Sequence, residues 1–202
     1  MAATSQLRRF TGDFRADVLV AVVIAAAFLA AQFYQRSLSS QTTPFVDSHS
    51  GFTLDIPDHW TVNTDSVTDT FVSAYNSRAD SIYKSTITGQ SFALDPDSPV
   101  ALDDLVDRLV QRHQIDLLGY HLLEIQTTAV AGADARLIQY AYVTRPIDDP
   151  FSSSPPVIVI AADTLIYTST EYWLLTTTAD EKIADQAQKE FDAILKSIRL
   201  PQ

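Results

Sequence analysis

Residues 51–60 read GFTLDIPDHW, and this stretch decides the fold class more clearly than any other part of the chain. Its apolar residues alternate with polar ones, which is the pattern of a half-buried strand. Pro57 ends the run, and an Asp-His turn then brings Trp60 back onto the sheet, where one ring can bury on the order of 200 Å². The stretch therefore predicts a strand, a turn and an aromatic anchor.

Runs of β-branched and aromatic residues after this stretch predict further strands, and two segments have helical spacing of apolar residues. The residues Asp97, Ser98 and Pro99 are typical of a helix start, and Thr178 with Glu181 fits a capping box. The fold class is therefore predicted as α+β, with an antiparallel sheet of about six strands and two amphipathic helices. The predicted strands span 70–75, 81–89, 121–130, 135–145, 157–168 and 172–178, and the helices 102–117 and 183–198.

Three short motifs resemble the PsbP-like (PsbP/DcrB-type) family. They are GFTLDIPDHW itself, VAGADAR at 130–136 leading into a strand, and residues 172–178 followed by the apolar pattern of residues 191–200. The resemblance spans about residues 45–200 and implies a lumenal, periplasmic or extracellular domain with an antiparallel sheet between helices. Because the family shares its architecture more than any activity, the resemblance implies no catalytic residue.

Residues 18–34 form an uncharged run that predicts a transmembrane segment. With Gln35 the run has a helical length of roughly 27 Å, close to the hydrocarbon core of about 30 Å. Arg8, Arg9 and Arg15 precede it and only Arg36 follows closely, so the N-terminus is predicted to be cytoplasmic. The alternatives are a cleaved signal peptide, for which Ala25-Ala26-Ala27 offers a site, and a buried soluble helix.

This orientation gives four predicted parts. They are a cytoplasmic segment (1–17), a single-pass signal anchor (18–35), a linker (36–44) and one extracytoplasmic domain (45–202), which is large enough for its own core. The chain carries a net charge of −11; residues 1–36 hold four arginines and two aspartates, about +2, so about −13 falls after Arg36. Such an acidic domain disfavours nucleic acid as a partner, and the lack of cysteine excludes thiol redox chemistry.

The best candidates for metal ligands are Asp47, His49, Asp58 and His59, with Asp55 beside them. Imidazole and carboxylate groups together can bind zinc or manganese if a turn brings them close. The alternative interpretation is structural, with Asp58 and His59 forming the turn before Trp60 and with Asp47 and His49 in a solvated lead-in.

Other chemistry has weaker support in the sequence. Acidic residues between positions 95 and 107 suggest calcium, but they lack an EF-hand pattern, and helix capping accounts for most of them: Asp95, Asp97, Asp103, Asp104 and Asp107. A hydrolase is a remote alternative, because no Gly-x-Ser-x-Gly elbow is present. Nucleotide-binding glycine motifs are absent too. His113 shares a helix face with leucines, which is typical of a residue at the core margin.

Aromatic residues crowd the predicted sheet, and they favour core packing over an exposed aromatic ligand face. These residues are Tyr140, Tyr142, Tyr167, Tyr172 and Trp173. With no convincing catalytic set and no cofactor motif, the sequence predicts a non-catalytic binding or assembly module. Its expected partner is a protein in a membrane complex, because a short tether would restrict the domain to the bilayer surface.

Overall fold

The computed structural model describes residues 24, 41–48, 50–63, 69–97, 100–146, 148–149, 152–153 and 155–201. The chain divides into two units, Met1–Gln41 and Thr42–Gln202, and every strand that is described belongs to the second. The membrane segment predicted at 18–35 lies outside the described residues except for Ile24, so it stays a prediction. Among the residues that are described, no helix is both long and apolar enough to cross a bilayer.

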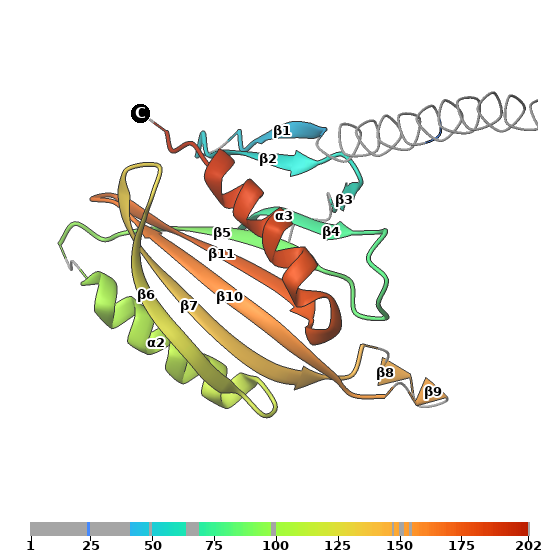
Figure 1. Ribbon diagram of the computed structural model, residues 1–202. Coiled ribbons are helices and arrows are strands. Elements are labelled where there is room, and N and C mark those ends of the chain that lie inside the picture. Colours follow the sequence, from blue (N-terminus) through green and yellow to red (C-terminus); the bar gives the residue numbers. More distant parts are fainter. Residues whose placement is uncertain are drawn as a thin grey trace, which may run out of the picture. The chain divides into compact units, whose positions relative to one another are not determined.

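A seven-stranded antiparallel sheet is the centre of the second unit, counted over the described residues (Figure 1). Its strand order is β3-β4-β5-β11-β10-β7-β6, so the longest strands lie together in one half. The α+β class is confirmed, with seven strands where the sequence predicted about six. The strands are β3 (Trp60–Val62), β4 (Thr70–Asn76), β5 (Thr86–Ala93), β6 (His121–Val130), β7 (Ala133–Thr144), β10 (Val157–Tyr167) and β11 (Glu171–Asp180).

The strand predicted from GFTLDIPDHW is present as β2 (Thr53–Pro57), but it lies outside the main sheet. It pairs with β1 (Thr42–Val46) in a separate two-stranded sheet. β1 begins within the range predicted as a linker, 36–44, because its backbone finds hydrogen-bonding partners in β2. A further short pair, β8 (Asp148–Asp149) with β9 (Ser152–Ser153), lies in the loop before β10.

The strand predicted at 81–89 begins later than expected, because its first residues form a turn. The Ser81 hydroxyl accepts the backbone N–H of Tyr83 at 3.1 Å and donates to Asp180 at 2.5 Å. These side-chain bonds satisfy local backbone groups and hold residues 81–83 out of the sheet. Strand β5 therefore starts at Thr86.

The two predicted helices are present as α2 (Leu102–Asp116) and α3 (Ala184–Ser197), but their starts differ from the predictions. Ala101 precedes α2 and offers no side-chain cap. The capping box predicted from Thr178 is wrong, because that residue belongs to β11. Asp180 caps the short 3-10 helix η1 (Glu181–Ile183) instead, accepting the backbone N–H of Lys182 at 3.0 Å.

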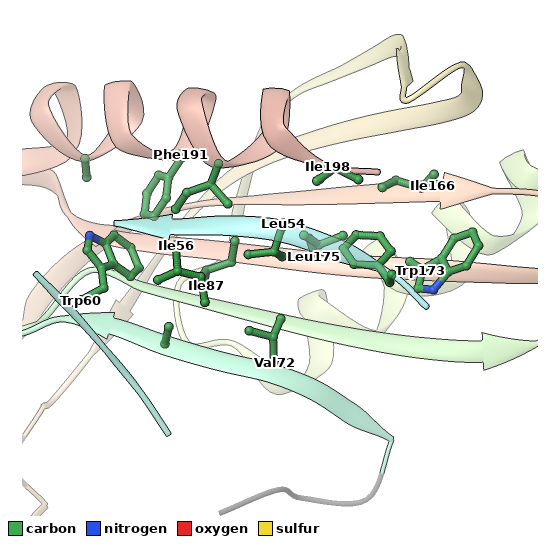
Figure 2. Close-up of a cluster of buried hydrophobic side chains, with 14 of the residues drawn as sticks. Leu54, Ile56, Trp60, Val72, Ile87, Ile166, Trp173, Leu175, Phe191 and Ile198 are labelled. Atoms are coloured by element: carbon green, nitrogen blue, oxygen red, sulfur yellow. The ribbon is translucent and has the colours of Figure 1, made fainter. Parts of the chain in front are cut away.

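Two apolar cores lie on opposite faces of the sheet, which confirms the predicted sandwich by helices. The larger is formed by α3, β2 and one face of β4, β5 and β11, and Figure 2 shows its side chains pointing between these elements. Helix α2 covers the other face (Figure 1), where Val106 packs with Ile138, Tyr140 and Ala161. The sheet thus separates two layers that depend on different helices.

Trp60 is the aromatic anchor that the opening stretch predicts. Its ring is 6% exposed and meets Phe191 of α3 edge-on at 5.8 Å, while Nε1 donates to Glu190 at 2.8 Å. The prediction that sheet aromatics pack in the core is confirmed for Tyr140 and Trp173, which are both almost fully buried.

Candidate functional site

Asp47, the first of the predicted metal ligands, lies directly after β1 and serves a local turn. Its Oδ2 accepts hydrogen bonds from the backbone N–H of Ser50 at 2.8 Å and from the Ser50 hydroxyl at 2.5 Å. His49 lies outside the described residues. The solvated lead-in of the structural interpretation is wrong for Asp47, which is 9% exposed and hydrogen-bonded within this turn.

Asp58 and His59 form the turn between β2 and β3, as the structural interpretation predicted. Asp58 Oδ1 accepts the hydroxyl of Thr43 at 2.7 Å, and His59 Nε2 lies 3.5 Å from Glu190 Oε1. Within the described ranges, no three histidine, aspartate or glutamate side chains gather closely enough to hold a metal ion. Because His49 is not among these residues, the zinc or manganese site stays a prediction.

The acidic residues near the start of α2 serve local structure and ion pairing. Asp95 accepts the backbone N–H of Asp97 at 2.9 Å. Asp103 and Asp104 lie in the first helical turn, where carboxylates interact favourably with the helix dipole. Asp103 also pairs with Arg136 of β7 at 2.9 Å. These contacts agree with the structural interpretation and give calcium no support.

A buried polar cluster lies between α2 and the sheet, and sequence reasoning missed its central residue. Asp163 of β10 is fully buried and receives hydrogen bonds from three other elements. His113 Nε2 lies 2.6 Å from its Oδ2, while Thr176 and Tyr140 donate to Oδ1 at 2.7 and 3.3 Å. We call these four residues the Asp163 cluster. They tie α2 to three strands.

Tyrosine rings surround this cluster and extend it along the sheet. The Tyr140 ring lies 4.7 Å from His113, 5.4 Å from Tyr120 and 6.2 Å from Tyr142, between centroids. Burial first, and then the nearby Asp163, raises the pKa of Tyr140, and burial likewise raises the pKa of Tyr142. Both phenols are protonated at neutral pH; Tyr140 donates to Asp163, and Tyr142 shares a hydrogen bond of 3.1 Å with the Tyr83 hydroxyl.

The Asp163 cluster is closed to substrates, since its carboxylate is fully buried and its donors all point to it. One sequence signal could have found it. Asp163 stands in the apolar run VIVIAADTLIY, and a carboxylate in the middle of such a strand needs a buried partner. No local pattern indicates that His113, 50 residues earlier, is that partner.

One concave surface among the described residues is a groove at the end of the sheet, with a volume of about 600 Å³. It lies between the β4–β5 loop, the start of β10 and the β11–η1 junction. Two large apolar side chains, Ile82 and Ile158, line it and are 58% and 46% exposed. The groove is lined by residues 79–82, Lys84, residues 155–158 and residues 180–182.

Comparison with known proteins identifies this architecture. Neither a family model nor a curated protein sequence matches the chain. Cyanobacterial PsbP (CyanoP) of Synechocystis has a TM-score of 0.56 at 11% identity, with 80% of this chain and 94% of that chain covered. LpqN of Mycobacterium tuberculosis, involved in cell envelope biogenesis, gives 0.53 at 16% identity, with 80% and 91% covered. The chain has the PsbP-like fold.

Similar structures of this fold extend to eukaryotes. The Ran-binding protein Mog1p of Saccharomyces cerevisiae has a TM-score of 0.50 at 10% identity, with 79% of this chain and 95% of that chain covered. Identities this low show a shared fold alone. The function of this domain therefore has to be inferred from its own residues. The resemblance drawn from the three short motifs is thereby confirmed at the level of fold.

The hydrolase alternative would need a serine and a histidine within hydrogen-bond reach of each other. In the part of the chain that the structure describes, no serine hydroxyl is hydrogen-bonded to the ring of His59, His113 or His121. His113 instead binds a carboxylate and packs against tyrosines. Because His49 is not among these residues, the hydrolase alternative stays a prediction.

Asp180, which lines the groove, is expected to make the domain sensitive to acid. Burial alone would raise its pKa, but hydrogen bonds from Ser81 and the Lys182 N–H, with the Lys182 charge, hold the pKa below its ordinary value. A carboxyl group with a lowered folded-state pKa stabilises the fold above its unfolded pKa of about 3.9, and this contribution is lost as pH falls through the folded pKa. Urea unfolding should thus show stability falling below about pH 4 less steeply in Ser81→Ala than in the wild type. Parallel pH profiles would contradict this assignment.

Proposed function

We propose that this chain is a non-catalytic binding module that docks, through the groove at the end of its sheet, onto an extended segment of a partner protein. The observation that carries the proposal is the exposure of Ile82 and Ile158 in one concave surface. Exposed apolar side chains that gather in a groove with polar residues around them are typical of a protein-binding site.

The polar groups of the groove are engaged in hydrogen bonds within the domain, which favours a binding role over a catalytic one. Lys84 donates to the backbone carbonyl of Ala79 at 2.7 Å, and Asp180 accepts from Ser81 and from the backbone of Lys182. These groups already fix the walls of the groove. A wall that is preorganised in this way lowers the ordering cost of binding a flexible segment.

The proteins that share the fold agree with a binding role, by analogy alone. Mog1p is described as Ran-binding and LpqN as involved in cell envelope biogenesis, whereas CyanoP is described as cyanobacterial PsbP with no stated activity. Folds of this kind host different functions on one scaffold. The analogy therefore supports protein binding as a class and names no partner for this chain.

The location of the module is part of the same proposal. The uncharged run at 18–34, with three arginines before it, would make a single-pass anchor with a cytoplasmic N-terminus. The acidic domain would then lie outside the cytoplasm, held close to the membrane by a short connection. Such tethering favours a partner that is itself a membrane complex, since the tether raises the effective concentration of the domain at the membrane.

The groove can be tested by placing charge on its apolar residues. Ile82→Asp and Ile158→Asp are expected to abolish copurification of the partner after chemical crosslinking in intact cells, because a buried unpaired carboxylate opposes an apolar contact. The matched control is Ile115→Asp on α2, whose side chain is 84% exposed and lies outside the groove. Equal loss of copurified protein in all three variants would contradict the groove as the docking site.

Protease accessibility tests the location separately. Protease added to intact cells or spheroplasts is expected to digest the domain, while a cytoplasmic marker protein stays intact. A domain that is protected until lysis would overturn the proposed orientation, even if the groove variants behave as expected.

A further inference from the structure

Strand β6 forms one edge of the sheet, and its outer side is free among the described residues. It pairs with β7 alone, and residues 123–129 are all exposed. Ten residues make an edge of roughly 33 Å. Two large apolar side chains, Leu123 and Ile125, are 52% and 44% exposed on it.

Beyond the irregularity between Leu122 and Glu124, this edge has few of the features that usually prevent strand pairing between molecules. Long flat edges are normally shortened, interrupted by proline, or protected by lysine. The opposite edge, β3, is only 3 residues long. β6 contains no proline and no lysine, and one acidic residue, Glu124. Its single irregularity is the register shift between Leu122 and Glu124, beyond which seven residues run regularly along β7 to Val130.

If β6 of a second copy of the chain lies antiparallel beside this strand, with Thr127 opposite Thr127, the seven residues of the two copies face complementary partners. Ile125 then faces Ala129 on the α2 side of the sheet, and Gln126 faces Thr128 on the other. Thr127 faces Thr127 of the second copy, and threonine pairs are favourable across strands. The two Glu124 side chains end up roughly 20 Å apart, beyond a Debye length of about 8 Å at physiological salt. The one charged residue therefore avoids its symmetry mate.

We propose that two copies of this chain associate by antiparallel pairing of their β6 strands about a two-fold axis at Thr127, which joins the two sheets into one. The dyad stands perpendicular to the sheet, so both α2 helices lie on the same face of the joined sheet. A two-fold interface of this kind uses the same patch on both subunits, and it closes without leading to fibres. The groove at the sheet end has its own lining residues, and its docking role does not depend on this pairing.

The first test is a charge at the dyad. Thr127→Lys places two ammonium groups opposite each other and should raise the dimer dissociation constant by about tenfold or more, measured by analytical ultracentrifugation of the full chain in detergent. The matched control is Thr61→Lys on the opposite edge strand, which is also exposed and should leave the dimer unchanged. A monomeric wild type, or equal effects of the two substitutions, would overturn the proposal.

The second test uses the absence of cysteine in the chain. Residues directly opposite each other in an antiparallel pair have Cα atoms about 4.5 or 5.5 Å apart, within the range of a disulfide. Thr127→Cys should therefore form a covalent dimer rapidly with diamide, in membranes or in detergent, whereas Thr61→Cys should not. If the two variants crosslink at equal rates, the disulfides form when molecules collide at random. That result would also overturn the proposal.

Discussion

Asp163→Ala is expected to destabilise the domain by about 3–5 kcal/mol, a large effect for a single polar substitution. The change removes the acceptor shared by His113, Thr176 and Tyr140, and it does so at a position with no exposed surface. Each buried donor left without a partner costs about 1–3 kcal/mol. Urea unfolding at neutral pH, followed by tryptophan fluorescence, measures the loss.

Two further variants measure how much individual hydrogen bonds of the Asp163 cluster contribute to stability. Thr176→Val removes one donor and keeps the shape of the side chain, so its expected cost is about 1 kcal/mol. Asp163→Asn keeps one acceptor oxygen, so its cost should fall between the costs of Asp163→Ala and Thr176→Val. If Asp163→Ala proves no more costly than Thr176→Val, the cluster does not hold α2 to the sheet.

Trp173→Ala is expected to cost about 3–5 kcal/mol, because it removes one of the largest fully buried side chains of the larger core. The Trp173 ring is 1% exposed and lies 5.7 Å from Phe52, and Figure 2 shows it at the opposite end of the cluster from Trp60. The free energy of unfolding from urea titration gives the value. The same change in Trp60, which is 6% exposed, provides a comparison.

The two tryptophans should respond differently to phenylalanine. Trp173 Nε1 is buried with no hydrogen-bond partner among the described residues, so Trp173→Phe removes an unsatisfied donor along with some volume. Trp60→Phe instead breaks a hydrogen bond to Glu190 of 2.8 Å. Trp173→Phe is therefore expected to be the milder change, and the reverse order would contradict the assignment of Trp173 Nε1 as an unsatisfied donor.

Local patterns in the sequence were enough to predict the elements that depend on their own periodicity. The stretch at 51–60 predicted strand β2 and the anchor Trp60, and the apolar spacing after Ile183 predicted α3. The sequence also predicted the hairpin of β6 and β7, with a turn at 131–134, but the turn is shorter: β7 starts at Ala133, and Ala131 and Gly132 both have positive φ, as a two-residue hairpin favours.

The rest depends on contacts between distant residues, which periodicity does not report. The start of β5 moved because Ser81 bonds to Asp180, 99 residues away. The partner of His113 lies on another element, and the groove combines segments from distant parts of the chain. Residues 42–44 resembled a polar linker because nothing local indicates that β2 will pair with them.

Site-specific photocrosslinking in living cells tests most directly whether this PsbP-like domain binds a protein through its groove. A photoreactive amino acid at Ile158 is expected to form a covalent adduct with one membrane-associated protein, which mass spectrometry would identify. The same group at Ile115, outside the groove, should not form this adduct. If Ile158 gives no protein adduct, or the same adducts as Ile115, the groove is not a protein-docking site.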